Sequence, residues 1–217
     1  METILKFLKQ LAKNNQKEWF DENRTTYETS KAEFESVVKA VIDKCISFDK
    51  ELGGLEAKKC LFRINRDVRF SKDKTPYKSN MGASISPGGK KSATPGYYIH
   101  IESGKSFLAG GSWQPEPEAL AAIRQEIDYH TPEFKKILNA KEFKTYFKDL
   151  SQDDKLKTAP KGYPKDHPEL SFLQHKHFIM EIALKDSEVL DKNFPTYVSK
   201  IFKAMYPMNQ FLRKAME

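Results

Sequence analysis

Residues 97–110, YYIHIESGKSFLAG, carry the pattern that decides the fold of this 217-residue chain. Apolar and polar residues alternate on both sides of Ser103-Gly104, and such a pair between two alternating segments predicts the two-residue turn of a β-hairpin. In this register Ile99 faces Leu108, and each strand places alternate side chains on opposite faces. One face then carries Tyr97, Ile99, Ile101 and Leu108, and the other carries Tyr98, His100, Glu102 and Phe107.

The segments around this hairpin predict further strands and helices. Short strands are expected at 61–65, 82–86 and 178–184, the last from its alternating apolar residues. Asn15, with Glu18 three residues later, resembles a capping box that starts a second helix. Further helices are expected at the N-terminus, at 26–52 before Gly53-Gly54, at 115–129, from Thr131-Pro132, and from Ser187 onwards with breaks at Pro195 and Pro207. A short one is expected around Phe143 and Phe147.

The order of these elements indicates the fold class. Helices come first, then strands, then helices again, then one strand and a last helix, which favours an α+β fold over an alternating βαβ sheet. The sequence contains no internal repeat and no linker-like stretch between domains. We therefore expect a single α+β domain over residues 1–217, with a mainly antiparallel sheet packed with helices.

Composition excludes several classes of protein. Hydrophobic residues make up 39% of the chain and aromatic residues 12%, which is enough for a core and argues against global disorder. Glycine aside, the longest unbroken apolar run is the five residues 119–123, whereas a membrane-spanning helix needs about 20. Two cysteines, Cys45 and Cys60, provide neither a disulfide framework nor a CxxC metal pair. These features predict a cytoplasmic protein with no membrane partner.

Positive charge is concentrated in one segment. The formal net charge of the chain is +7, yet residues 58–91 hold ten basic and two acidic residues, a charge of +8 that leaves −1 for the rest. Without a ligand, such crowding of like charges costs stability. The segment 58–91 is therefore the candidate region for an anion-binding site.

Residues 63–78, RINRDVRFSKDKTPYK, form the centre of the cationic segment. Arginine forks suit bidentate recognition of carboxylate or phosphate, and an aspartate can hold one arginine while another stays free. We expect the ligand-binding residues to be Arg63, Asp67, Lys72, Asp73, Lys74 and Lys78. If the protein is an enzyme, the catalytic residues are expected to be Arg66, Arg69, Tyr77 and His100. The alternative is a solvated basic loop in which the Arg–Asp pairs are structural.

Other polar side chains are candidates for a site. His100, Glu181 and Arg63 would support acid–base chemistry if their strands are neighbours, and a structural hydrogen-bonded network is the alternative. His175 and His177, with His167 upstream, lack an acidic ligand at matching spacing, so no metal site is predicted. Residues 88–92, GGKKS, lack the glycine spacing of a phosphate-binding loop. No cofactor is expected.

The cationic segment also resembles a known family. Its pattern Arg-x-x-Arg-Asp-x-Arg-Phe, followed by Asp-Lys-x-x-Tyr, is similar to the signature of the family called domain of unknown function 2461. Further similar parts are Asn14-Asn15 with Trp19-Phe20 and Tyr27, the strand 97–101, the stretch 111–115, and Pro160-Lys161-Gly162 running to His167-Pro168. The resemblance implies one compact domain. It implies no activity, because the family is uncharacterised.

Three functions are compatible with these observations. The first is binding of an anionic, phosphate-bearing ligand, with action on a nucleotide or nucleic-acid phosphate as one form of it. Arg66 and Arg69 would then stabilise charge while Tyr77 or His100 moves a proton. The second is a nucleic-acid-binding module without catalysis, and the third is a domain that binds an acidic protein partner. The sequence indicates neither the oligomeric state nor a reaction.

Overall fold

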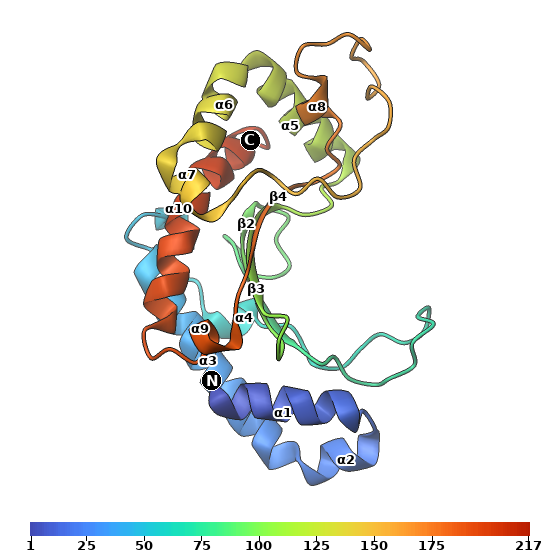
Figure 1. The fold of residues 1–217 in the computed structure, drawn as a ribbon, viewed down its shortest axis with the longest axis vertical. Coiled ribbons are helices and arrows are strands. Elements are labelled where there is room, and N and C mark those ends of the chain that lie inside the picture. Colours follow the sequence, from blue (N-terminus) through green and yellow to red (C-terminus); the bar gives the residue numbers. More distant parts are fainter.

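The fold was obtained as a computed structural model that describes all residues, 1–217. It contains one antiparallel sheet of four strands in the order β1-β2-β3-β4, which are Met81–Ile85, Gly96–Ile101, Phe107–Ser112 and Phe178–Ala183 (Figure 1). Ile99 pairs with Leu108 across β2 and β3, and the N–H of Lys105 donates to the carbonyl of Glu102 at 3.0 Å. The predicted hairpin and the α+β class are confirmed.

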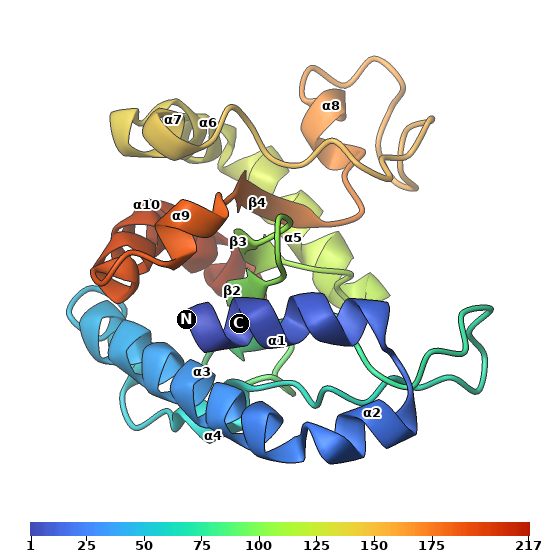
Figure 2. The ribbon, with the colours of Figure 1, turned by 60° about the horizontal axis from the view of Figure 1, so that its bottom comes forward.

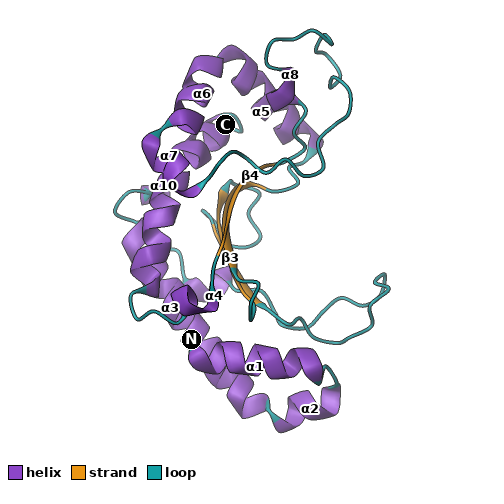
Figure 3. Cartoon of the chain, viewed as in Figure 1, coloured by secondary structure: helices purple, strands orange, loops and turns teal.

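The chain also forms ten α-helices, which leave one face of the sheet uncovered (Figure 3). They are α1 Glu2–Lys13, α2 Lys17–Glu22, α3 Arg24–Cys45, α4 Ala57–Cys60, α5 Pro117–Tyr129, α6 Thr131–Asn139, α7 Lys141–Tyr146, α8 Leu170–Leu173, α9 Asp186–Val189 and α10 Phe194–Lys214, with a 3-10 turn at Lys50–Leu52. None of them has both the length and the apolar composition that a membrane crossing requires.

One face of the sheet is covered by helices. Helix α10 packs against β3 and α3, and Tyr97 on β2 stacks on Phe202 of α10 with ring centroids 4.7 Å apart. Gly110 lets α10 approach closely, because a Cβ there would lie 2.6 Å from the sulfur of Met205. The buried apolar residues form one contiguous cluster of 45 residues. No helix covers the opposite face, which lies on the inner side of the curved molecule (Figure 3).

A buried ionic clamp fixes the C-terminal end of α10. Arg213 donates two hydrogen bonds of 2.9 Å to the carboxylate of Asp49, and the hydroxyl of Tyr97 donates to the same carboxylate at 2.8 Å. Asn209 donates to the carbonyl of Gly96 at 3.0 Å, and Arg213 also donates to the carbonyl of Pro95 at 2.9 Å. The clamp therefore joins α10, the start of β2 and the segment after α3.

Four local predictions need correction. The helix predicted at 26–52 ends at Cys45, before the 3-10 turn. Pro207 does not break α10, because the extensive buried face of this helix compensates for the hydrogen bond lost at a proline. Asn15 does not cap α2. Instead its side-chain amide bonds the backbone N–H and carbonyl of Tyr77 at 3.1 and 2.9 Å.

The fourth correction concerns the strand predicted at 61–65. Leu61 forms an isolated bridge with Ala83 of β1, whereas Asn65 forms one with Tyr77 on the returning arm of the next loop. The segment divides its hydrogen bonds between two partners, so a continuous ladder does not form.

Candidate functional site

Residues 66–75, here called the cationic loop, project away from the body of the protein between α4 and β1 (Figure 2). Arg66 forms an ion pair with Asp73 and donates to the hydroxyl of Thr75 at 3.2 Å. Arg69 forms a two-pronged pair with Asp67, with N–O distances of 3.0 and 2.6 Å. Four of the predicted site residues, Arg66, Asp67, Arg69 and Asp73, therefore form ion pairs with one another within the loop.

Lys74 and Lys72 occupy the same loop. The ammonium group of Lys74 donates to the carbonyl of Val68 at 2.9 Å, which closes the loop from inside. Lys72 is exposed, and no ion pair joins it to a carboxylate. At the tip, Phe70 is 95% exposed, with the guanidinium of Arg69 at 5.9 Å from its ring centroid.

Three cations gather at the base of the cationic loop. Partial burial, and then the nearby charges of Arg63 and Arg66, lower the pKa of Lys78. The pair with Arg69, and to a smaller degree Arg63, lowers the pKa of Asp67. Neither Arg63 nor Lys78 forms an ion pair with a carboxylate. Arg63 and Lys78 at this base therefore lack a carboxylate partner, as Lys72 does in the loop, but of these three only Lys78 is partly buried.

Tyr77 is part of the core. Its ring is buried and stacks on Phe20 with centroids 4.0 Å apart, and its backbone is bonded by Asn15. Trp19 and Tyr27 pack near Phe20 around Phe7 of α1. The aromatic positions near the N-terminus therefore anchor the returning arm of the cationic loop to α1 and α2.

The uncovered face of the sheet, here called the concave face, carries a chain of polar side chains. The Nε2 atom of His100 lies 3.1 Å from the Glu102 carboxylate, and Nδ1 lies 3.3 Å from the hydroxyl of Tyr98. Ser79 donates to the other oxygen of Glu102 at 3.0 Å, and the His100 ring stacks on Phe107 with centroids 4.5 Å apart. This arrangement can relay a proton between Glu102 and Tyr98.

The set expected from the sequence, His100 with Glu181 and Arg63, is only partly brought together. Glu181 lies on the concave face two strands from His100, which binds Glu102 instead. Partial burial and the charge of Asp153 raise the pKa of Glu181, whereas His100 lowers it. No hydrogen bond connects Arg63 with either residue.

A cavity of about 570 Å³ opens on the concave face. Small residues make its floor, and they are Ser84 on β1, Gly96 on β2, and Ala109, Gly110 and Gly111 on β3. Larger side chains surround the floor, and they are Phe62, Lys78, Lys90, Tyr98, Phe107, Trp113 and Glu181. Tyr98 needs a glycine beside it, because a Cβ on Gly82 would lie 2.4 Å from its hydroxyl oxygen.

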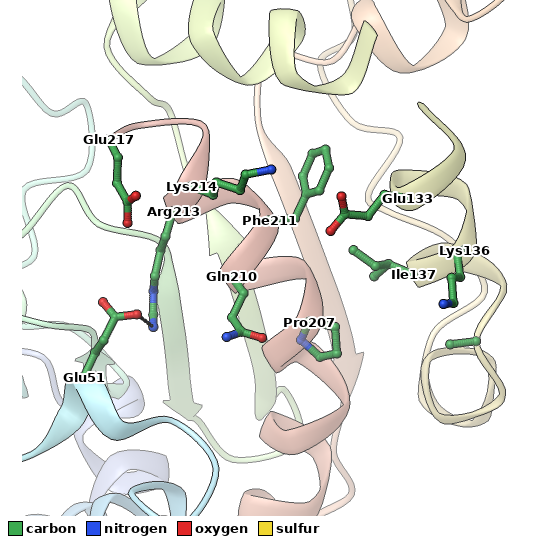
Figure 4. Close-up of a pocket in the computed structure, with 11 residues that line it drawn as sticks. Glu51, Glu133, Lys136, Ile137, Pro207, Gln210, Phe211, Arg213, Lys214 and Glu217 are labelled. Carbon is green, nitrogen blue, oxygen red and sulfur yellow. Dashed lines mark hydrogen bonds and ion pairs between the residues drawn. The ribbon is translucent and has the colours of Figure 1, made fainter. Parts of the chain in front are cut away.

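A second cavity, of about 590 Å³, lies between α6 and the end of α10 (Figure 4). Two of its three cations pair within the protein, since Arg213 lies 3.0 Å from Glu51 and Lys214 lies 3.0 Å from Glu126. The third, Lys136, shares the cavity with the unpaired carboxylates of Glu133 and Glu217. The cavity on the concave face is therefore the better candidate for an anionic ligand.

A comparison with protein-family models finds one match, described as "Conserved hypothetical protein (DUF2461)", over residues 3–211. The chain belongs to this family. The DUF2461 match runs from α1 into α10, so it includes the cationic loop and the concave face. No curated protein and no solved structure gives a significant match.

The structure of this DUF2461 chain adds residues that sequence reasoning missed. Tyr98, Lys90 and Trp113 line the cavity but were not predicted as site residues. The sequence could have indicated Tyr98, because the predicted hairpin places it on the same face as His100. Trp113 lies in one of the stretches similar to the family, yet only the fold shows that it is exposed beside the cavity.

The histidines predicted not to bind metal lie at the other edge of the sheet. His175 and His177 are buried, and each has one ring nitrogen without a hydrogen-bond partner. Burial, and then the charge of Lys155, lowers the pKa of His175 to about 4. No group of three or more His, Cys, Asp or Glu side chains is arranged to hold a metal ion.

Proposed function

We propose that this DUF2461 protein binds an anionic, phosphate-bearing ligand in the cavity of the concave face, with Lys78 and Lys90 as the cations that contact it. The observation that carries the proposal is that both lysines line the cavity and neither forms an ion pair with a carboxylate. A bound phosphate would supply the missing negative charge.

The surroundings of Lys78 strengthen the case. Its ammonium group lies 5.5 Å from the ring centroid of Phe62, and partial burial, followed by the charges of Arg63 and Arg66, lowers its pKa. A ligand bearing negative charge would attract all three cations and offset their mutual repulsion. Lys90 donates a hydrogen bond to the carbonyl of Leu61, a neutral group that leaves its charge uncompensated.

The internal pairs of the cationic loop fit this proposal as supports. Arg66–Asp73 and Arg69–Asp67 fix the shape of the loop, and the bond from Arg66 N–H to Pro76 carbonyl, 2.9 Å, closes its base. We therefore assign the loop's Arg–Asp pairs a positioning role and Lys78, at its base, a direct one.

Thermal denaturation with added pyrophosphate tests the proposal. A ligand at 100 times its Kd stabilises the folded state by about 2.7 kcal/mol, which for a chain of this size raises Tm by about 5–11 °C. Lys78→Met and Lys90→Met should each remove most of this shift. Lys91→Met is the matched control, because Lys91 is exposed next in sequence and does not line the cavity.

Lys72→Met separates the tip of the cationic loop from its base. If the shift survives in Lys72→Met and disappears in Lys78→Met, the base and cavity are the site. Absence of any shift with pyrophosphate, phosphate or sulfate in the wild-type protein would refute anion binding.

A second candidate function is binding of single-stranded nucleic acid, and the tip of the cationic loop favours it. Phe70 is almost fully exposed between Arg69 and Lys72, and an exposed ring among cations can stack on a base. If about five phosphates are neutralised, affinity should fall with salt with a log–log slope of about −3.5. Binding that does not change with salt would contradict this function.

A further inference from the structure

The two sides of the cavity on the concave face carry opposite charges. Lys78 and Lys90 flank β1, at one edge of the sheet, whereas Glu181 lies on β4, at the other edge. Three inter-strand spacings separate these edges, a distance of about 14 Å. A ligand that fills the cavity should therefore carry negative charge at one end only.

Glu181 disfavours negative charge of a ligand on its side of the cavity. Its carboxylate forms no ion pair within the protein, and a second anion beside it would be repelled. Hydroxyl or amino groups of a ligand would instead donate hydrogen bonds to it. The hydroxyls of Ser84, Ser92 and Ser112 offer further partners around the cavity.

Trp113 gives this cavity an aromatic wall. The indole is 64% exposed although it is large and apolar, and the ring of buried His177 supports it from one side at a centroid distance of 4.7 Å. The indole lines the cavity and can be reached by a ligand there. Such a supported, exposed ring is suited to stacking on a flat heterocycle.

The floor leaves space for a flat ring. Gly96 pairs with Gly111 across β2 and β3, and Tyr98 pairs with Ala109 in the next row on this face. Glycine is required at both positions, because a Cβ would lie 2.5 Å from the carbonyl oxygen of Ile85 at Gly96 and 1.9 Å from that of Phe178 at Gly111. These glycines allow close packing of neighbouring backbone, and the space for a ring is the cavity that they line together with Ser84 and Ala109.

We infer that the ligand is a nucleoside phosphate, with its base stacked on Trp113, its donor groups near Glu181 and its phosphate between Lys78 and Lys90. The inference rests on the proposed anion binding and adds the nucleoside to it. A free nucleotide and a nucleotide unit of a single strand share this chemistry, and the experiment includes both.

Tryptophan fluorescence tests the inference directly. The chain has two tryptophans, so Trp19→Phe leaves Trp113 as the only indole. This Trp19→Phe protein is titrated with pyrophosphate, adenosine, ADP, UDP and an eight-residue oligothymidylate. At least one of the two nucleotides should quench Trp113 and bind about tenfold or more tightly than pyrophosphate. Tighter binding of the oligothymidylate, with the same quenching, would support the inference and identify a strand as the source.

Variants are measured by calorimetry in the otherwise wild-type protein. Trp113→Ala should weaken the nucleotide about tenfold and leave pyrophosphate unchanged. Tyr129→Ala is the control, because Tyr129 is also an exposed aromatic, at 68%, but lies outside the cavity. If ADP and UDP bind no more tightly than pyrophosphate, the nucleoside is wrong while anion binding stands. If no anion binds, both fail.

Discussion

Replacing Arg213 with methionine should strongly destabilise the protein, although α10 itself would keep its apolar packing. The Asp49 carboxylate is 0% exposed, and two of its three side-chain hydrogen bonds come from Arg213. Arg213→Met leaves this carboxylate buried with only the hydroxyl of Tyr97 as a partner. A buried charge without its counterion must either stay unpaired or take up a proton, and both cost free energy.

The magnitude follows from the burial of the pair. Removing one partner of a buried ion pair costs about 3–5 kcal/mol. The second pair of Arg213, with the exposed carboxylate of Glu51, adds about 0–1 kcal/mol at most. For a chain of this size the total corresponds to a Tm lower by about 6–24 °C. Urea denaturation followed by circular dichroism measures the free energy of unfolding directly.

A double-mutant cycle makes the prediction specific. Asp49→Leu combined with Arg213→Met removes both charges, so it should be more stable than Arg213→Met alone, with a coupling energy of about 1–3 kcal/mol. Because the clamp also bonds the carbonyls of Pro95 and Gly96, Arg213→Met should loosen the floor of the cavity and weaken pyrophosphate binding. A loss below about 1 kcal/mol, or additive single variants, would refute the role given to the pair.

Three further predictions test the site and the core. Gly82→Ala should lower the free energy of unfolding by about 1–3 kcal/mol, because the added methyl group overpacks against the hydroxyl of Tyr98. Adding Tyr98→Phe should restore part of this stability. A loss of stability that Tyr98→Phe does not change would contradict the contact. Burial lowers the pKa of His175 from 6.5 to about 4, so on acidification the unfolded chain takes up this proton before the folded protein does. The contribution of His175 to stability should be full above pH 6.5 and fall by up to about 3 kcal/mol as the pH decreases towards 4. His175→Gln should flatten this part of the pH profile measured by urea denaturation, and an unchanged profile would exclude His175 as the cause. Phe70→Ala should change the free energy of unfolding by less than about 0.5 kcal/mol, because the ring of Phe70 is 95% exposed. In a filter-binding assay, a clear loss of single-strand binding by this variant would favour the second candidate function, and no loss would count against it.

The local sequence pattern was enough to predict several elements of the fold. The β2–β3 hairpin was predictable because a turn of two residues fixes the register, and the register fixes which side chains share a face. Strand β4 followed from its alternating apolar residues. The strand expected at 61–65 did not form, since its hydrogen bonds go to two partners that are far apart in sequence and that no local pattern specifies.

The candidate site was predictable only as a region. Charge counting found the cationic segment, and the motif placed Arg66, Arg69 and Lys78 within it. Residue types could not show that Arg66 and Arg69 pair with Asp73 and Asp67 inside the loop, while Lys78 lines a cavity. Pairing depends on how the loop closes, and closure depends on Asn15, which bonds Tyr77 across 62 positions of sequence.

The sequence by itself determined the fold class, the central hairpin, the family and the segment where positive charge collects. These features depend on neighbouring residues, whose spacing, propensity and charge are visible along the chain. Only the tertiary structure decided which cations remain uncompensated, and that Trp113, Lys90 and Glu181 surround one cavity. Those residues come from three separate parts of the chain, and the physical reason they meet is the order of the four strands, which brings both edges of one sheet around a floor of small side chains.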